Sequence, residues 1–307
     1  MVDATISRVR VAIWHAWDAQ SPAAAVGAGL REVCASPDAP AHAPEQTVSW
    51  HQPSRLARMS GSNKALLGRA KQYVPLSVKR KLRKSLPARY RRLWDPDWHR
   101  STVRGTADFW EELGRAQLDY LVEQGLQPSH YVLDVGCGPL RAGVHFIRYL
   151  EPGHYAGIDK RGDNLEHAQK VELPRQGLVD KQPLLLVNGL FEFRKLGQTF
   201  DYAIAQSVFT HLPVNTITRC LVEMAHALRP GGRFYATIYE NPQGKSYLDD
   251  IQQSERVTSH YDRDSYHYDL ETLRAACAGT GLTMSYVGDW GHPDNQKMVV
   301  FTREADV

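Results

Sequence analysis

The sequence predicts an α/β protein built on a doubly wound, mostly parallel sheet of seven strands, with helices on both faces. Two observations predict this fold class. From about residue 105 onward, short apolar runs alternate with segments whose apolar residues recur at helical spacing, which is typical of parallel strands joined by helices. The last two apolar runs, 282–287 and 297–302, are joined by too few residues for a crossover helix, so the final strand is expected to be antiparallel.

The predicted elements follow one another in a regular order. A first helix has an apolar face that begins at Phe109 and Trp110, and it ends near Gly125. Two of the later helices are expected to end at the proline and glycine residues of 152–153 and 230–232, because neither residue type continues a helix well. The expected strands are 131–135, 155–158, 184–187, 200–206, 233–239, 282–287 and 297–302, and the expected later helices are 140–150, 163–172, 217–228 and 269–278.

Composition divides the chain into three regions. Residues 1–63 are rich in alanine, proline and serine and have little apolar surface to bury, so we expect a largely disordered extension. Residues 64–104 are expected to form a basic helical arm, since 64–92 hold 11 basic and no acidic residues. Within the arm, 74–94 carries an apolar stripe, which fits either a solvated flanking helix or peripheral contact with a membrane surface or another anionic partner. Residues 105–307 form the α/β domain.

Charge and cysteine usage argue against several classes of protein. Residues 93–307 contain 21 basic and 29 acidic residues, which disfavours a dedicated nucleic-acid-binding face. The sequence has no apolar run near the roughly 18 residues that a membrane helix needs. The four cysteines include no C-x-x-C pair, a pattern typical of reduced thiols inside the cell rather than of disulfide or zinc sites. We therefore expect a cytoplasmic protein without a metal, associated with membranes only through its basic arm.

The segment VLDVGCG at 132–138 carries the strongest functional signal. Gly136 and Gly138 directly follow a predicted strand, where glycine lets the backbone turn sharply and approach a ligand. Asp159 ends the next predicted strand, and a carboxylate there can accept hydrogen bonds from ribose hydroxyls. A dinucleotide site would have a third glycine where Arg141 stands, and Asp134 suits a ligand that carries an ammonium group. The pattern thus predicts a ribose-bearing cofactor and leaves a dinucleotide as the less favoured alternative.

Four segments in this order resemble the successive motifs of class I S-adenosylmethionine (SAM)-dependent methyltransferases. They are VLDVGCG, Asp159, FDYAIAQSVFTHL at 200–212 and LRPGGRF at 228–234, and the resemblance covers roughly 105–302. One departure is Leu140, which stands where the family usually has another glycine. The resemblance implies SAM as cofactor, with its methionine part at Asp134, Gly136 and Gly138, its ribose at Asp159 and its adenine at Asn188, Gly189 and Leu190. Gln206, Ser207 and Val208 would run beneath the methionine part and the sulfonium, and Cys137 and Lys160 are further expected cofactor-binding residues.

Methyl transfer from SAM is a displacement at carbon, so the protein has to align a nucleophile and exclude water. A hydroxyl acceptor also profits from a base, and His211 and His267 are the candidates. For His211, a packing role at a helix entry is an equally good interpretation. The segment 259–268 is expected to form a substrate lid. The candidate acceptor-binding residues are Tyr239, Glu240, Tyr261, Tyr268, Trp290 and His292.

Several functions remain open from the sequence. The favoured hypothesis is methyl transfer to a hydroxyl of a small-molecule, glycan or glycolipid acceptor. A nucleic-acid methyltransferase is favoured by the basic arm, but 206–212 lack the Asn/Asp-Pro-Pro-Tyr/Phe motif of base-amino methylation. The sequence also leaves open a non-catalytic binding protein of the same fold and a dehydrogenase. It determines neither the acceptor nor the oligomeric state.

Overall fold

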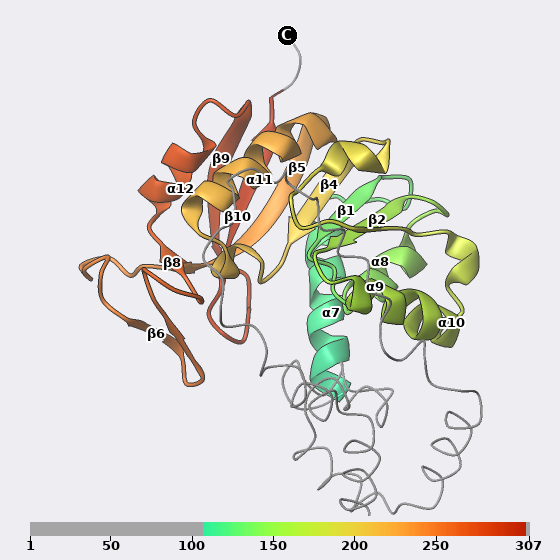
Figure 1. Ribbon diagram of the computed structural model, residues 1–307, viewed down its shortest axis with the longest axis horizontal. Helices are drawn as coiled ribbons and strands as arrows, with labels where there is room; N and C mark the ends of the chain where they lie inside the picture. Colours follow the sequence, from blue (N-terminus) through green and yellow to red (C-terminus); the bar gives the residue numbers. More distant parts are fainter. Residues whose placement is uncertain (1–106, 305–307) are drawn as a thin grey trace, which may run out of the picture. The chain divides into compact units, whose positions relative to one another are not determined.

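The computed structural model describes residues 107–304 (Figure 1). The expected extension at 1–63 and the expected basic arm at 64–104 lie outside these residues, so both stay predictions. Within 107–304, we find no helix that is both long enough and apolar enough to cross a membrane.

The predicted sheet is present, with its strands in the order β3-β2-β1-β4-β5-β10-β9. The strands are β1 (Val132–Val135), β2 (Tyr155–Asp159), β3 (Leu184–Val187), β4 (Phe200–Ala205), β5 (Leu228–Glu240), β9 (Leu282–Asp289) and β10 (Lys297–Arg303). The first five pair in parallel, whereas β10 is antiparallel to both β5 and β9. The fold class, including the antiparallel final strand, is therefore confirmed. The strand order reverses at β1, and open α/β sheets bind ligands at the carboxyl ends of the strands beside such a reversal.

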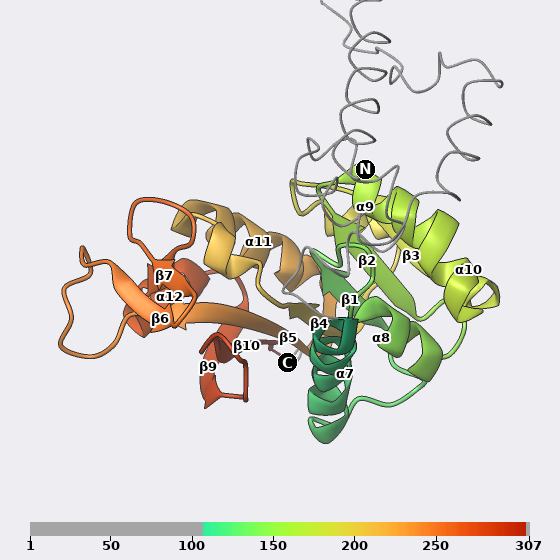
Figure 2. The same ribbon diagram turned by 90° about the horizontal axis from the view of Figure 1, so that it is seen from below.

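Helices cover both faces of this sheet, as predicted. They are α7 (Ala107–Glu123), α8 (Gly143–Tyr149), α9 (Gly162–His167), α10 (Leu173–Gln176), α11 (Val214–Ala227) and α12 (Leu270–Cys277). Successive strand residues alternate between two apolar cores, as Val132 and Leu133 do. One core includes residues of α7, α8 and α9, and the other includes residues of α11 and α12. Figure 1 shows α11 and α12 together over the half of the sheet that holds β5, β10 and β9, and Figure 2 shows the same layers from below.

Several element boundaries differ from the sequence prediction. Strand β5 begins at Leu228 instead of residue 233, because Leu228 pairs with Phe200 ahead of an irregularity in the register. The helix expected at 163–172 is split into α9, a π-helical turn η2 (Ala168–Glu172) and α10. Proline lacks the N–H that an α-helix uses, and Pro174 in the first turn of α10 explains a wider turn just before it. The helix expected at 140–150 begins only at Gly143.

A small hairpin between β5 and α12 was not predicted. Strands β6 (Ile251–Ser254) and β7 (Val257–Ser259) pair antiparallel, and the two-residue strand β8 (His267–Tyr268) pairs with the end of β5. Figures 1 and 2 show the hairpin projecting beyond the sheet. The buried Gln253 amide ties it to the body, because it donates to the Glu240 carbonyl at 3.0 Å and to the Ser259 hydroxyl at 2.9 Å. The expected lid segment thus begins on a hairpin that buried hydrogen bonds anchor.

Gly114 in α7 is the point where this helix meets the loop that precedes α8. A Cβ there would lie 2.3 Å from the Arg141 carbonyl oxygen. Glycine to alanine inside a helix ordinarily stabilises a protein by about 1 kcal/mol, but here the backbone has to move. We expect Gly114→Ala to lower the free energy of unfolding by about 1–3 kcal/mol in urea titrations. The exposed neighbour Arg115→Ala is the control and is expected to change it by less than about 0.5 kcal/mol. A stabilised Gly114→Ala protein would contradict the close approach.

Candidate functional site

The turn after β1 is formed by glycines in the left-handed region. Gly136 has φ +74° and Gly138 has φ +55°, values that side-chain-bearing residues rarely adopt. The N–H groups of Gly136 and Cys137 donate to the Ile158 carbonyl of β2 at 2.8 and 3.0 Å. A Cβ on Gly136 would lie 2.6 Å from Val208 Cγ2. The turn is therefore held tightly between β2 and the segment after β4, and only glycine fits at its first position.

Leu140 explains why α8 begins late. It has φ +70° without being glycine, a strained conformation for a branched side chain. Its side chain is fully buried, and it fills the space over Gly143, where a Cβ would lie 2.6 Å from Leu140 Cδ2. Burial of the Leu140 side chain offsets the backbone strain. Leucine in place of the family's usual glycine therefore changes where α8 begins but leaves the preceding turn intact.

Asp159, at the end of β2, holds the glycine turn in place. Its Oδ2 accepts the Gly138 N–H at 2.9 Å, and its Oδ1 accepts the Arg161 N–H at 2.7 Å and the Asn164 side-chain amide at 3.3 Å. A carboxylate offers about four acceptor positions. Three are used within the protein, and Asp159 is 8% exposed, which leaves little more than one position for hydroxyl donors of a ligand.

Asp134 lies inside β1, and only 5% of it is exposed. The Tyr155 hydroxyl donates to its Oδ2 at 2.8 Å. Burial raises the pKa of the Asp134 carboxyl to about 7, although the Tyr155 hydrogen bond and the positive charge of Arg141 both act to lower it. A buried carboxyl with this raised pKa ionises readily when a cation binds beside it. Without a cation, its ionised form is energetically unfavourable.

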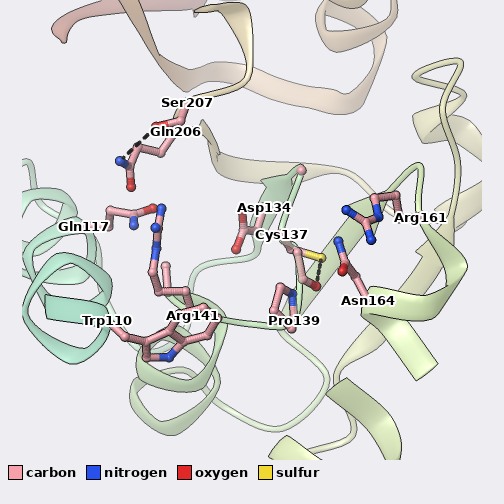
Figure 3. Close-up of a pocket in the computed structure, with 13 residues that line it drawn as sticks. Trp110, Gln117, Asp134, Cys137, Pro139, Arg141, Arg161, Asn164, Gln206 and Ser207 are labelled. Carbon is pink, nitrogen blue, oxygen red and sulfur yellow. Dashed lines mark hydrogen bonds between the residues drawn. The ribbon is translucent and has the colours of Figure 1, made fainter. Parts of the chain in front are cut away.

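A cavity of about 240 Å³ opens over the turn (Figure 3). Figure 3 shows Asp134 near its middle, with Arg161 and Asn164 toward one end and Arg141, Gln117 and Gln206 toward the other. Its lining residues are Trp110, Gln117, Asp134, Gly136, Cys137, Gly138, Pro139, Arg141, Ala142, Arg161, Asn164, Gln206 and Ser207. The first glycine turn and the end of β4 thus meet at one cavity, as the sequence predicted for Asp134, Gly136, Cys137, Gly138, Gln206 and Ser207.

Ser207, directly after β4, is a second strained residue at this cavity. It has φ +56°, and its N–H donates to the Thr237 hydroxyl of β5 at 2.7 Å. Its own hydroxyl donates to Gln296 Oε1 at 3.1 Å, and Thr237 donates to the same oxygen at 2.6 Å. Buried polar groups from three segments therefore fix the backbone that forms this wall.

Asn188 forms hydrogen bonds within its own loop. Its Oδ1 accepts the N–H groups of Leu190 and Glu192 at 2.9 and 3.2 Å, and its Nδ2 donates to the Glu192 carboxylate at 3.0 Å. The side chain therefore closes its own loop, as asparagine often does in turns, and its oxygen already has two donors. Asn188, Gly189, Leu190, Lys160 and Val208 are not among the residues lining this cavity, so their contacts with adenine, ribose or sulfonium stay predictions.

His211 lies in the short turn η5 (Phe209–His211) after β4. Its Nδ1 is 2.5 Å from Asp264 Oδ1 in the expected lid, and the side chains are 49% and 60% exposed. The lid also pairs with η5 through its backbone, since the Tyr266 N–H donates to the Thr210 carbonyl at 2.8 Å. If Nδ1–H donates to Asp264, the other ring nitrogen is left to accept a proton. The equal alternative, a helix-entry residue that packs on its own loop, does not account for this exposed carboxylate partner.

His267 differs from His211 in being fully buried. Its Nδ1 is 3.1 Å from the Ser259 hydroxyl, and its Nε2 is 3.0 Å from the Tyr247 carbonyl oxygen. One ring nitrogen therefore ties β8 to the hairpin, and the other ties it to the loop that precedes the hairpin. A general-base role for His267 would require one of these hydrogen bonds to break, and the geometry favours a structural role in its place.

The candidate acceptor residues are spread over different surroundings. Tyr239 and Tyr268 are buried, and their hydroxyls bond inside the protein to Gln296 and to the Leu212 carbonyl, so their contact with an acceptor stays a prediction. Tyr261 is 44% exposed on the lid. Glu240 accepts a hydrogen bond from Tyr286. Trp290 and His292, in the loop between β9 and β10, lie in a tilted ring contact with 5.5 Å between their centroids.

Five polar or aromatic lining residues were not identified from the sequence: Trp110, Gln117, Arg141, Arg161 and Asn164. Trp110 was assigned to the apolar face of a helix, and both Trp110 and Gln117 lie on α7, which also forms part of the cavity wall. Arg141 was noted only as a non-glycine residue. Asn164 could have been found, because it stands five residues after Asp159 in the first turn of the next helix, where its amide reaches the carboxylate.

Three features of the protein itself indicate that the residues at this cavity fit a SAM molecule. The turn contains a position where any side chain would collide with Val208. A buried carboxyl on β1 lacks a cationic partner within ion-pair distance among the residues of 107–304. The Gln206 side-chain oxygen is buried and has no hydrogen-bond partner among the same residues. A ligand with an ammonium group, a ribose and further polar groups matches these three features.

Comparisons with known proteins agree with this geometry. A family model described as a methyltransferase domain matches residues 133–234. The probable methyltransferase ltbC of Aspergillus luteorubrus is 27% identical over 115 residues, which are 35% of this chain and 39% of that protein. An uncharacterized methyltransferase of Schizosaccharomyces pombe is 28% identical over 107 residues, which are 33% of this chain and 37% of that protein. The chain thus spans about two fifths of the length of these curated relatives.

Among solved structures, the magnesium protoporphyrin IX methyltransferase ChlM of Synechocystis PCC 6803 with bound SAH is similar over 67% of this chain and 93% of that one, with 17% identity and a TM-score of 0.49. The family match covers β1 to β5, the strands that carry the glycine turn, Asp159 and the polar wall after β4. Residues 133–234 thus match a methyltransferase domain, and the strand order and ordered motifs of the chain are similar to those of class I SAM-dependent methyltransferases.

Proposed function

We propose that this protein transfers a methyl group from SAM to a hydroxyl of a small-molecule or glycan acceptor. The observation that carries the proposal is the single cavity at which Asp134, the glycine turn and the wall after β4 meet, with Asp159 directly behind the turn. SAM supplies the methyl group, bound to a sulfonium that is already a good leaving group. The protein then has to hold the cofactor, exclude water and place the acceptor.

Different residues would carry out these tasks. Ionised Asp134 would hold the ammonium group of the cofactor, in a buried setting where such a charge pair is strong. Asp159 would accept a hydrogen bond from a ribose hydroxyl at the acceptor position that its bonds to the turn leave free. Gln206 and Ser207 would form the wall beneath the reacting centre, since buried hydrogen bonds of Ser207 to Thr237 and Gln296 make this wall rigid. Gly189 and Leu190 would meet the adenine.

For the acceptor, His211 is the base that the geometry supports best. It follows the end of β4 by a few residues, its ring is oriented by Asp264, and it is exposed to an incoming hydroxyl. The proton of the acceptor would go to His211 Nε2, while Asp264 would stabilise the resulting imidazolium. Tyr261, Trp290 and Glu240 surround the same carboxyl edge of the sheet from other loops and would contact the acceptor.

The cofactor part of the proposal is tested by calorimetry with S-adenosylhomocysteine and, separately, with NADH. We expect binding of the first and none of the second. Incubation with SAM carrying a labelled methyl group and a panel of hydroxylated small molecules, sugars, lipid-linked sugars and RNA then tests the acceptor class. Transfer of label to RNA alone would replace the small-molecule proposal, whereas binding of NADH alone would refute the assignment to SAM.

We expect His211→Ala to lower kcat by about 100- to 10,000-fold, because general-base catalysis contributes about that much. The Kd for S-adenosylhomocysteine is expected to stay unchanged, since His211 does not line the cavity. Asp264→Asn is expected to lower kcat as well, because its amide nitrogen would donate to Nδ1 and leave the proton on the wrong ring nitrogen. The measurement is steady-state turnover of the acceptor found in the panel, together with calorimetry.

The control is His226→Ala, since His226 is another exposed histidine, at the end of α11. It is expected to leave kcat unchanged. If His211→Ala retained full turnover, His211 would be a packing residue and the base would lie elsewhere.

A further inference from the structure

The expected lid, 259–268, carries a second histidine–aspartate pair that the proposed function does not use. His260 Nδ1 lies 2.6 Å from Oδ1 of Asp250, in the loop before β6. The His260 side chain is 16% exposed, whereas that of His211 is 49% exposed. A guanidinium also holds the carboxylate in place, because Arg263 donates to Asp250 Oδ2 at 3.3 Å. The histidine of this second pair is therefore more enclosed than His211, and its carboxylate has a further partner.

The contacts of His260 leave one ring nitrogen for a ligand. The hydrogen bond from His260, together with the charge of Arg263, holds the pKa of the Asp250 carboxyl below its usual value, so this carboxyl is ionised at neutral pH. An ionised carboxylate only accepts hydrogen bonds, so His260 Nδ1 carries a proton. The Arg263 guanidinium lies 2.9 Å from the same Nδ1. Both polar contacts of the ring within 107–304 thus involve Nδ1, and in the neutral imidazole Nε2 is left as an acceptor.

The backbone of the lid places His260 near His211. On one side of Tyr266, its N–H donates to the Thr210 carbonyl at 2.8 Å. On the other side, the Ser265 carbonyl accepts the His260 N–H at 2.7 Å, and His260 forms a β-bridge with Tyr266. Neighbouring extended segments lie about 4.8 Å apart, so the backbones of His260 and Thr210 are separated by roughly 10 Å. Because His211 directly follows Thr210, one ligand of about that length can contact both histidines.

The charges around this pair indicate an uncharged acceptor. The lid and the loop before β6 contribute the carboxylates of Asp250, Asp262 and Asp264 and only one guanidinium, that of Arg263, which already pairs with two of them. This excess of negative charge disfavours a phosphate or carboxylate on the acceptor. Imidazole nitrogens that accept hydrogen bonds select donors such as hydroxyls. Tyr261, between the two pairs along the chain and 44% exposed, adds an aromatic ring for an apolar surface of the acceptor.

We propose that His260 binds a second hydroxyl of the acceptor while His211 removes the proton of the first, so that the acceptor is an uncharged polyol such as a sugar ring. The inference rests on the proposed function and narrows its acceptor class. His260 Nε2 accepts the hydrogen bond, whereas Asp250 and Arg263 are positioning residues because they act through the His260 ring. An acceptor with a single hydroxyl leaves His260 Nε2 without a partner and therefore binds more weakly.

The test measures turnover of the full chain with SAM that carries a labelled methyl group. The probes are methyl glycosides of common sugars, phosphorylated forms of the same glycosides, and cyclohexanol, a ring with one hydroxyl. We expect the highest kcat/KM for an uncharged glycoside. Octyl glycosides distinguish a lipid-linked from a free sugar, since both present the same hydroxyls. Label on none of the glycosides would overturn the inference, as would a higher kcat/KM for cyclohexanol or for the phosphorylated forms.

Two variants separate acceptor binding by His260 from support of the lid. His260→Asn places an amide NH₂ at the Nδ1 position and keeps the contact with Asp250, but it has no atom at the Nε2 position. His260→Gln reaches the Nε2 position with its amide oxygen and loses the contact with Asp250. We expect His260→Asn to raise the KM of the glycoside by roughly 2- to 10-fold, the range for one neutral hydrogen bond, with kcat nearly unchanged. His260→Gln is expected to restore most of the wild-type KM.

A His260 that only supports the lid would give the reverse order, with His260→Asn like the wild type and His260→Gln impaired, and this result would overturn the inference. His226→Asn, at the exposed histidine near the end of α11, is the matched control and is expected to keep the wild-type KM. Failure of the proposed function is a distinct result, because the wild type would then bind no S-adenosylhomocysteine. Melting curves of each variant identify any loss of fold.

Discussion

Asp134→Asn is expected to weaken cofactor binding strongly and at the same time to stabilise the free protein. The buried carboxylate would be the partner of the cofactor's ammonium group, and loss of one partner of a buried charge pair costs about 2–5 kcal/mol, which corresponds to roughly 30- to 5,000-fold in Kd. Asparagine has nearly the same shape, and its oxygen can still accept the Tyr155 hydroxyl that now lies 2.8 Å away. The expected loss is therefore one of charge and not of packing.

The stability of the free protein changes in the opposite direction. Because burial raises the pKa of Asp134 to about 7 from 3.8, the protonated carboxyl is the form that the fold favours. Its stabilising contribution is complete below about pH 4 and is lost as the pH rises through about 7. At about 1.4 kcal/mol for each unit between these values, ionised Asp134 costs the folded protein on the order of 4 kcal/mol at pH 8. We expect Asp134→Asn to recover much of this free energy, seen as a higher Tm at pH 8 and little change in Tm at pH 3.

The same pKa gives binding a pH dependence. Only ionised Asp134 attracts an ammonium group, so the affinity of the wild type for S-adenosylhomocysteine is expected to fall about tenfold per unit as the pH drops below about 7. The residual binding of Asp134→Asn is expected to be flat over this range. Asp180→Asn, at an exposed acid in a turn far along the chain from β1, is the control for both measurements. Unchanged affinity and unchanged Tm in Asp134→Asn would contradict the role of this carboxyl.

The cofactor side of the site was predictable because its signals are local. Gly136 and Gly138 follow a strand at once, and Asp159 ends the next strand, so the strand order alone brings them together. The polar wall after β4 was also found, since Gln206 and Ser207 continue β4 directly. The positions of these residues follow from their sequence neighbours and from the strands, and the periodicity of apolar residues predicts those strands.

The other residues of the site depend on contacts that no local pattern contains. Trp110 and Arg141 meet because α7 packs against the loop before α8, and Gly114 permits that approach. The Asp264 partner of His211 lies 53 residues away along the chain. Asn188 and His267 were assigned functional roles by residue type, but hydrogen bonds within their own surroundings occupy both side chains. The hairpin of β6 and β7 was missed because its residues are mostly polar and are held by Gln253 instead of by an apolar face.

Asp159→Asn is expected to have the second large effect, on the ribose end of the cofactor. Asp159 has room for about one ribose hydroxyl beside its bonds to the turn, and a hydrogen bond to a charged group contributes about 1.5–3 kcal/mol, so its loss corresponds to roughly 10- to 150-fold weaker S-adenosylhomocysteine binding. The exchange also disturbs the turn. The Asn NH₂ would face either the Gly138 N–H at 2.9 Å or the Arg161 N–H at 2.7 Å, and neither can accept it.

These two effects of Asp159→Asn can be separated by the choice of ligand. Methylthioadenosine keeps the ribose and lacks the amino-acid group, and its analogue without one ribose hydroxyl probes the contact itself. The wild type is expected to bind the first more tightly, whereas Asp159→Asn is expected to bind both weakly and equally. Asp163→Asn removes the same charge from the same turn, where Asp163 pairs with the partly exposed Arg161 side chain, and it is expected to keep the preference of the wild type. If Asp159→Asn kept that preference, Asp159 would act only by holding Gly138, and the ribose would be bound by other groups.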